Sequence, residues 1–473
     1  MNRSFILGCL GVLVTAAPAT AEDGDWRGEM PALGPTPEIN MPTYEREVLD
    51  NGLTVLVATL RDLPILSLRL VTRGGAAMDP GGQAGLSSLV YGMLEEGAGE
   101  RSALEFSDAL ADLGAGFSSG SARDHGQVAL TGLSRVGDDV AAILADAVRR
   151  PRLAEEDFER LRGETLAGLE ARLGSPHGLA FMVVPGLVYG PEHPYGHPPS
   201  GDAKSLAGLS IADVKAHHER LLVPGRSAFV AVGDIDLEGA VALAKKHFGD
   251  WPELREDPLD IPAVEATERR QIAMVDKAKS PQTMAVIARP LFARGHPDEE
   301  ALELANGVFG GSFASRLNMT LREDKGYTYG ASSNVSFRRG VGVFTAASAL
   351  QADHGADGIW EMLAELTRIS ESPPTAEELD RVKKGRIRGL PGDFERVSDL
   401  AGVAGQLFVY ELPLDWYDHV AERITAVSLE RVQAVAKKYL DPEVMTVLLV
   451  GDVASTKPKL EERDLGPIEV VAP

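Results

Sequence analysis

One short segment in the second half of the chain holds the residues best suited to chemistry. Residues 310–330 read GGSFASRLNMTLREDKGYTYG, and Arg322 and Tyr329 lie seven residues apart in it. A guanidinium offers five fixed hydrogen-bond donors, and a phenol offers one rotatable hydroxyl. Together they could hold peptide carbonyls or stabilise a developing oxyanion. The spacing alone fits a surface arginine beside a strand aromatic equally well.

The local pattern predicts how this segment positions both side chains. A helix is expected over about 312–324, and Gly326 then ends it. Tyr327 and Tyr329 open a strand, in which alternate residues share a face, so both are expected to point the same way. A turn of this kind can place the guanidinium of Arg322 and a phenol around one small space.

Other kinds of catalytic site find little support in the sequence. Cys9 is the only cysteine, and it lies in a segment expected to be removed, so no disulfide, cysteine zinc site or cysteine nucleophile is expected. His193 and His197 are four residues apart, but Pro194 and its neighbours prevent one continuous helix there. The chain contains no H-E-x-x-H motif, and no serine-nucleophile elbow is expected.

The first residues resemble a secretory signal. Arg3 provides a positive end, Phe5–Val14 is a short apolar run, and Ala19-Thr20-Ala21 is a small-residue cleavage site. Cleavage before Glu22 predicts an exported protein, periplasmic if the source is a Gram-negative bacterium. A lipoprotein that uses Cys9 fits less well, because only four residues of the apolar run precede it. No later segment reaches membrane-spanning length.

The balance of charge argues against nucleic acid as the main partner. The chain has 47 Lys and Arg against 70 Asp and Glu, a net charge of −23. Phosphate binding needs clustered positive charge. The acidity is compatible with basic or neutral peptides, and the simplest interpretation is that it keeps an exported protein soluble.

An internal repeat indicates two related halves. Ser210–Asp236 aligns without a gap with Ser428–Ala454 over 27 residues, 8 of them identical. The repeated unit is a helix, a turn with proline, a buried strand and a Gly-Asp turn. A second pair, Asp157–Leu169 and Glu378–Leu390, precedes it in the same order.

These patterns predict the boundaries of the parts of the chain. In the first half, strands are expected at 53–60, 65–73, 127–133 and 227–232, and helices at about 84–96, 102–113, 136–149, 154–173 and 210–222. Mixed strands and helices predict an α+β fold. The expected parts are a signal peptide (1–21), an N-terminal arm (22–42), a first domain (43–252), a linker (253–270), a second domain (271–456) and a tail (457–473).

The segment over 310–330 resembles the second-half signature of M16 peptidases, the family of pitrilysin, insulinase and the mitochondrial processing peptidase. A glycine-rich turn, SRL, LRE and a later tyrosine occur in this order. The duplicated halves and the HPYG at His193–Gly196 are also similar to this family, over roughly residues 43–456.

The resemblance implies a fold and a set of site residues. It implies two homologous halves of the M16/LuxS-like metallohydrolase type, each a mostly antiparallel sheet with helices on one face, which fold over an enclosed peptide chamber. It implies that Arg322 and Tyr329 assist binding of the substrate and the transition state. The substrate-binding residues that it implies are Gly310, Gly311, Ser312, Phe313 and Tyr327.

The zinc motif of active family members is degenerate here. Active members carry an inverted H-x-x-E-H, in which two histidines bind zinc and glutamate acts as base. The matching segment, residues 85–93, reads GLSSLVYGM. Ser88 and Gly92 stand at the histidine positions and Tyr91 at the glutamate position. The third ligand would be Glu164 or Glu170, and one carboxylate does not hold catalytic zinc, so no metal is expected on this chain.

The resemblance thus leads to two hypotheses about function. In the first, the chain is an M16-type subunit, inactive alone, that supplies Arg322 and Tyr329 in trans to an H-x-x-E-H-bearing partner, which carries zinc and completes a metalloendopeptidase. In the alternative, it is a peptide-binding or scaffold protein without turnover. Either a heterodimer or a homodimer is compatible with these hypotheses. A zinc peptidase that acts alone would need the ligands that Ser88 and Gly92 replace.

Overall fold

The computed structural model describes residues 34–35, 41–253, 259–265 and 267–472. The expected signal peptide (1–21) and nearly all of the expected arm (22–42) lie outside the described residues. The chain divides into two compact units, 1–37 and 38–473.

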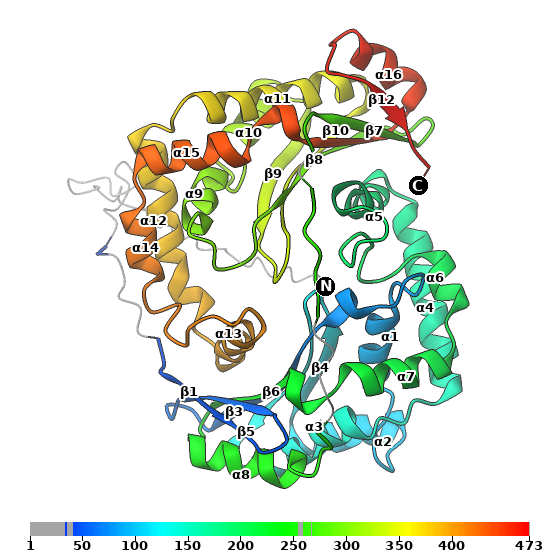
Figure 1. Cartoon of the computed structure of the whole chain (residues 1–473), viewed down its shortest axis with the longest axis vertical. Helices are drawn as coiled ribbons and strands as arrows, with labels where there is room; N and C mark the ends of the chain where they lie inside the picture. The colour runs from blue at the N-terminus through cyan, green and yellow to red at the C-terminus, as the bar shows by residue number, and fades with distance from the viewer. Residues whose placement is uncertain (1–33, 36–40, 254–258, 266, 473) are drawn as a thin grey trace, which may run out of the picture. The chain divides into compact units, whose positions relative to one another are not determined.

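Two six-stranded sheets form the frame of this unit (Figure 1). The first has the order β1-β2-β6-β3-β5-β4, and the second has the order β12-β7-β11-β8-β10-β9. The strands of the first sheet are β1 (Tyr44–Val48), β2 (Thr54–Thr59), β3 (Ile65–Arg73), β4 (Gly116–Ser121), β5 (His125–Leu133) and β6 (Ser227–Gly233). Those of the second are β7 (Gln271–Asp276), β8 (Gln282–Leu291), β9 (Thr328–Ser336), β10 (Gly342–Gln351), β11 (Thr446–Gly451) and β12 (Ile468–Val470).

The two sheets share a topology, as the internal repeat predicts. In each, the repeated strand, β6 or β11, runs parallel to one neighbour and antiparallel to the other. Most pairings in both sheets are antiparallel, so the predicted α+β class is confirmed. The sheets differ at one edge, where β1 pairs antiparallel with β2 but β12 pairs parallel with β7. The expected tail (457–473) therefore contributes a strand to the second sheet.

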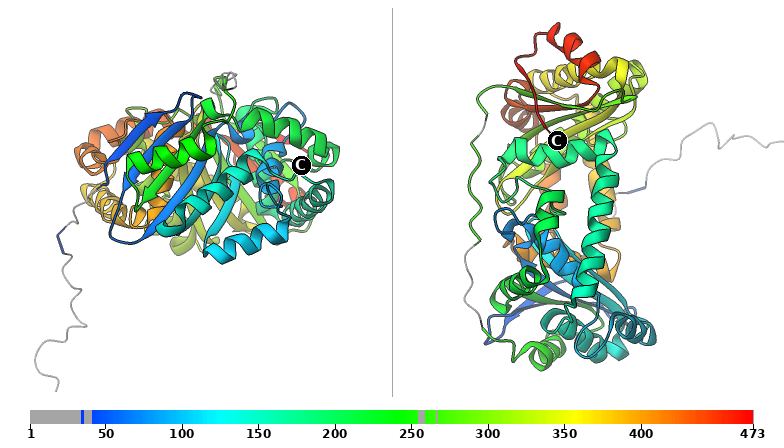
Figure 2. Two further views of the ribbon diagram at one scale, coloured as in Figure 1. Left: turned by 90° about the horizontal axis from the view of Figure 1, so that it is seen from below. Right: turned by 90° about the vertical axis from the view of Figure 1, so that its right-hand side faces the viewer.

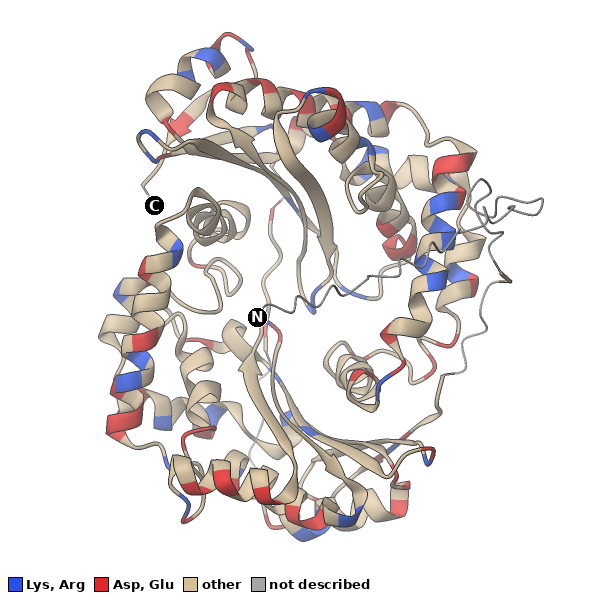
Figure 3. Cartoon of the chain, turned by 180° about the vertical axis from the view of Figure 1, so that it is seen from behind, with Lys and Arg blue, Asp and Glu red and all other residues tan. Residues whose placement is uncertain are grey.

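Helices cover the outer face of each sheet and carry most of the charged residues (Figure 3). The helices expected in the first half are present, within a few residues of the predicted ends. Among the described residues, no helix is long and apolar enough to span a bilayer. The helices are α1 (Leu86–Met93), α2 (Ala103–Leu113), α3 (Gly137–Arg149), α4 (Glu155–Leu173), α5 (Pro176–Tyr189), α6 (Ala203–Gly208), α7 (Ile211–Leu221), α8 (Leu237–Phe248), α9 (Glu299–Phe309), α10 (Arg316–Asn318), α11 (Gly355–Glu371), α12 (Ala376–Asp393), α13 (Val397–Val409), α14 (Val420–Ala426), α15 (Leu429–Tyr439) and α16 (Val453–Glu461).

The inner faces of the sheets are covered by an exchange of helices between the halves (Figures 1 and 2). Helix α5, from the first half, packs on β8 and β11 of the second sheet. Helix α13, from the second half, packs on β3 and β6 of the first sheet. The expectation of helices on one face thus holds within each half, while the other half supplies the helix on the second face. Arg69 and Arg73, predicted on the face of β3 opposite its leucines, contact α13.

The HPYG loop joins the two halves. Tyr195 donates a short hydrogen bond to Asp124, and its hydroxyl accepts one from the backbone N–H of Gly340 at 3.2 Å. Asp124 also accepts a hydrogen bond from the N–H of Arg339 at 3.0 Å. Since Asp124 and Tyr195 are buried, this contact fixes the turn that follows β9 against the first half.

Candidate functional site

The segment with Arg322 folds differently from the predicted regular helix. The helix begins at Arg316, later than the expected 312, and after Asn318 it becomes a π-helix over Met319–Asp324. Gly326 ends it with φ of 66°, as predicted. A π-helix inserts an extra residue per turn and is frequent at functional sites.

Ion pairs and hydrogen bonds anchor this segment to the helices behind it. Arg316 makes two hydrogen bonds to Glu378 at the start of α12, at 2.8 and 2.7 Å. The hydrogen bond from Arg316 lowers the pKa of Glu378 to about 2. Two acidic residues of α11 hold the π-helix: Glu365 accepts from Thr320 at 2.6 Å, and Glu361 pairs with Lys325 at 2.7 Å. The segment is thus fixed on one side and free on the other.

Arg322 lies on the free side of the π-helix. Its guanidinium carbon lies 4.9 Å above the ring centre of Phe313, and its side chain is 40% exposed. Its Nε lies 3.2 Å from a carboxylate oxygen of the neighbouring Glu323. Phe313 is itself 65% exposed. The aromatic ring supports one face of the guanidinium, which leaves donors at its edge available to a ligand.

Tyr329 is presented to solvent by a β-bulge. Ser348 pairs with Ala331 and Leu350 with Thr328, so Tyr329 and Gly330 together lie opposite a single residue of β10. The hydroxyl of Thr328 holds this irregular backbone through the carbonyls of Gly330 and Ala349, at 3.0 and 2.8 Å. A bulge redirects a side chain, and Tyr329 is 90% exposed.

Tyr327, unlike Tyr329, is packed against the body of the protein. It precedes β9, and its ring stacks on His354 with centroids 4.3 Å apart and packs against the second core. The π-helix, which carries Arg322, packs against β9, which carries Tyr329.

The glycine-rich turn packs tightly against β9 and α9. A Cβ on Gly310 would lie 2.4 Å from Oγ of Ser333, and one on Gly311 would lie 2.8 Å from the amide nitrogen of Asn306. Both positions therefore require glycine. Gly311 and Ser312 line a pocket of about 470 Å³ between α9, α12 and β9. These predicted substrate-binding residues thus border a cavity.

Asn318 is a positioning residue that the sequence interpretation missed. Its amide donates to the carbonyl of Phe313 at 2.8 Å, and its side-chain oxygen accepts from the N–H of Ala331 at 3.1 Å. Asn318 is 4% exposed. It links the turn that carries Phe313 to the strand that carries Tyr329. Its only signal in the sequence is a polar residue among the apolar positions of a predicted helix.

The degenerate zinc motif lies on α1, and its residues pack closely against their neighbours. Tyr91 is fully buried, and a Cβ on Gly126 would overlap its ring, at 1.9 Å from Cζ. A Cβ on Gly92 would lie 2.9 Å from a methyl group of Leu161. Ser88 donates to the carbonyl of Pro199 at 2.7 Å. Burial raises the pKa of Tyr91, so this hydroxyl stays protonated.

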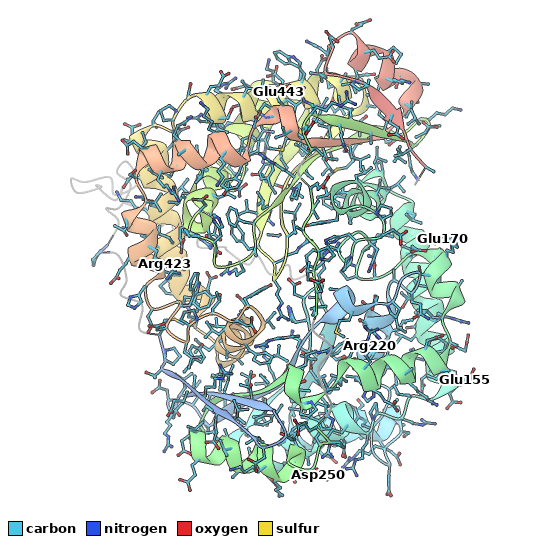
Figure 4. The ribbon with its side chains drawn as sticks, in the orientation of Figure 1. Glu155, Glu170, Arg220, Asp250, Arg423 and Glu443 are labelled. Atoms are coloured by element: carbon cyan, nitrogen blue, oxygen red, sulfur yellow. The ribbon has the colours of Figure 1, made fainter. Side chains whose placement is uncertain are left out.

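The candidates for the third ligand are not directed at this motif. Glu164 is exposed and pairs with Arg160 at 3.1 Å, and Glu170, labelled on α4 in Figure 4, is exposed. In the described part of the chain, no group of three or more His, Cys, Asp or Glu side chains could hold a metal. Zinc binding needs three or four N, O or S ligands, and Ser88, Tyr91 and Gly92 do not fit it.

Comparison with known proteins gives consistent matches across the chain. Residues 56–177 match the family model described as insulinase (peptidase family M16), and residues 208–386 match the model described as the peptidase M16 inactive domain. An uncharacterized zinc protease of Mycobacterium leprae is 23% identical, covering 87% of this chain and 92% of its own length. A non-peptidase homolog of Helicobacter pylori is 19% identical, covering 84% and 91%.

A solved structure shows the same fold. The crystal structure of a peptidase M16 inactive domain from Pseudomonas fluorescens matches with a TM-score of 0.81 and 27% identity. The match covers 86% of this chain and 98% of that one.

Proposed function

The chain belongs to the M16 peptidase family, and from this premise we propose that it is a subunit without a zinc site of its own. It would supply Arg322 and Tyr329 in trans to an H-x-x-E-H-bearing M16 partner that carries the zinc. The two chains together would hydrolyse peptides.

One contrast within the molecule supports this proposal most. The three positions of the zinc motif make packing contacts in the first half, whereas Tyr329 is held by a bulge with its side chain 90% exposed. Exposing a tyrosine on an irregular, internally braced strand brings no packing gain to this chain. We infer that the exposed hydroxyl of Tyr329 binds a ligand or a partner chain.

The chemistry of this chain would be the binding of a peptide main chain. The edge of the Arg322 guanidinium and the hydroxyl of Tyr329 would donate hydrogen bonds to the carbonyl oxygen of the bond that is cleaved. Such donors act most strongly when that oxygen gains negative charge. Asn318 and the Arg316–Glu378 pair would keep both donors in place.

The proposal is tested with the complex rather than with the chain alone. The chain is co-expressed with an H-x-x-E-H-bearing M16 protein from the same source, and kcat/KM is measured on a mixed peptide library. Arg322→Ala or Tyr329→Phe is expected to lower kcat/KM by about 10²–10³-fold, the usual loss for one transition-state donor. Arg61→Ala, which removes an exposed arginine of the first half, should leave kcat/KM unchanged. Full activity of both site variants would contradict the proposal.

A second candidate is a peptide-binding or scaffold protein without turnover. The relative named as a non-peptidase homolog favours it. In that case the chain would bind peptide or partner, alone or as a homodimer, and no pairing with an H-x-x-E-H protein would produce cleavage.

We also propose export, on the signal-like sequence of residues 1–21. N-terminal sequencing of the protein from its natural host tests this, with Glu22 as the expected first residue.

A further inference from the structure

A cavity of about 360 Å³ lies between the first sheet, α13 and the loop that follows β8. Arg69 of β3 and His125 of β5 line it from the sheet, and Arg294 lines it from the second half. This volume is near the lower end of the range for ligand sites, about 300–1,000 Å³. It can hold one small group, but not a length of peptide. The cavity adjoins a larger pocket, which shares Arg69 and Arg294 with it and is also lined by acidic side chains such as Asp399.

The residues that line this cavity include two guanidiniums and no carboxylate. Arg294 is already matched by a buried ion pair with Glu299 at 2.9 Å. Arg69, in contrast, has no carboxylate within 4 Å among the described residues. It donates to the neutral side chain of Gln127 at 3.3 Å and, through a short bond, to the carbonyl of Ser398.

Arg69 therefore carries a positive charge with no carboxylate in direct contact, and Asp399 balances it only from a distance. Burial lowers the pKa of Arg69, and the negative charge of Asp399 offsets this only in part. Three lining side chains also keep an unused polar atom in the described structure: Nε of Arg69, Nε of Arg294 and Nδ1 of His125. A partly buried, unmatched cation is costly unless an anion joins it.

The helix over the cavity leaves space above this guanidinium. Gly402 and Gly405 lie one turn apart in α13, and glycine weakens a helix relative to alanine. At Gly405 a Cβ would lie 3.2 Å from a methyl group of Val71, so tight packing explains the glycine. At Gly402 a Cβ would lie 3.5 Å from Nη1 of Arg69, an ordinary contact. Packing therefore does not require glycine at position 402. Because Gly402 has no side chain, the cavity stays open over Arg69.

We propose that this cavity binds a carboxylate of a peptide, with Arg69 as its main partner. The inference rests on the proposed function, because it assumes that the two halves enclose a peptide. The amides of Gln127 and Gln406, which also line the cavity, would donate further hydrogen bonds. The carboxylate is either the C-terminus of the peptide or an acidic side chain. Although the net charge of the chain is −23, the local positive charge at this site would bind an anion.

The test measures binding by the full chain without any partner. Three fluorescein-labelled peptides of otherwise identical sequence are compared by fluorescence anisotropy: one with a free C-terminus, one amidated, and one amidated with an internal Gln replaced by Glu. The wild-type chain is expected to bind one or both acidic forms about tenfold or more tightly than the neutral amide, as for a charged hydrogen bond. Preference for the first or the third peptide distinguishes the terminal from the side-chain source.

Two variants on different elements assign the preference to this cavity. Arg69→Met should abolish the discrimination, and Gly402→Val should reduce it by filling the space above the guanidinium. Gly402→Val also carries the test if Arg69→Met fails to fold. Arg61→Met, which removes an exposed arginine paired with Asp236, should keep it. Equal binding of all three peptides, no binding of any, or discrimination that survives both cavity variants would overturn the proposal.

The outcome is separable from that of the proposed function. Arg322→Ala should lower kcat/KM of the complex by about 10²–10³-fold but keep the preference for a carboxylate in this assay. Equal binding of the three peptides would leave the expected effect of Arg322→Ala on the complex unchanged, so the two proposals can fail separately.

Discussion

The two halves of this molecule share one architecture, but α1 of the first half and the segment Gly310–Tyr329 of the second half place their side chains in opposite ways. In the first half, α1 carries the degenerate motif, and Tyr91 fills the space beside β5 with its side chain fully buried. In the second half, the segment from Gly310 to Tyr329 exposes Phe313, part of Arg322 and Tyr329. The motif helix of the first half thus buries its side chains, whereas the segment of the second half exposes them to solvent.

The comparison of the two tyrosines gives the largest expected effect. Tyr91→Ala should lower the free energy of unfolding by about 3–5 kcal/mol, because it leaves a cavity in the first core. Tyr329→Ala should change it by less than about 0.5 kcal/mol, as usual for an exposed side chain. Urea unfolding of both variants measures this. Similar losses of unfolding free energy in both variants would contradict the proposed difference between the two tyrosines.

The restoration of the zinc motif sharpens the same contrast. Ser88→His/Tyr91→Glu/Gly92→His is expected to destabilise the protein without creating a zinc site. A side chain at 92 meets Leu161, and a glutamate at 91 would be buried among apolar groups. Unfolding midpoints and zinc content by atomic absorption are the readouts. If the triple variant folds and binds zinc stoichiometrically, the first half still has the space and the geometry for a zinc site.

Asn318 is expected to matter less for stability than Tyr91 but more for the site. Asn318→Ala leaves the buried N–H of Ala331 without its partner, at a cost of about 1–3 kcal/mol. It should also lower kcat/KM of the complex, because Phe313 and Tyr329 lose their common anchor. Asn334→Ala, an exposed position on the same strand, serves as the control. Loss of stability with unchanged kcat/KM would show that Asn318 has no positioning role.

Acid should weaken the contact between Arg316 and Glu378 in the second half. The folded-state pKa of Glu378 is lowered to about 2 by its hydrogen bond with Arg316, whereas the ordinary value is near 4.5. The stabilisation is therefore present above about pH 4.5 and is lost as the pH falls toward 2. Glu378→Gln should flatten the dependence of the unfolding midpoint on pH in this window.

The first half supplies the control for this titration. Asp157 aligns with Glu378 in the repeat, but its nearest arginine nitrogen, in Arg152, lies 3.9 Å away. Asp157→Asn should therefore leave the acid dependence in place. If it flattens the dependence as much as Glu378→Gln, the Arg316–Glu378 pair is not the cause.

The sequence predicts the local elements and the duplication well. The alternating residues of β3 set its limits at 65–73, and the repeat identifies β6 and β11 as equivalent strands. These features follow from patterns within one element. The exchange of α5 and α13 between the sheets could not be predicted, because an apolar helix face does not specify which sheet it meets.

The sequence suggests the residues of the candidate site but not their geometry. The order of Arg322 and Tyr329 could be recognised, whereas the bulge at Tyr329–Gly330 depends on pairing with a distant strand. The π-helix depends on anchors from α11, such as Glu365. Both are tertiary effects that override the local preference for regular structure.

The central claim is that zinc chemistry and the Arg/Tyr donors lie on different chains. Zinc content and peptide cleavage are measured for this chain, for an H-x-x-E-H-bearing M16 protein from the same source, and for the two together. The account predicts no stoichiometric zinc and no cleavage for this chain alone, zinc on the partner, and cleavage by the pair that Tyr329→Phe strongly reduces. Stoichiometric zinc and cleavage by this chain alone would contradict it.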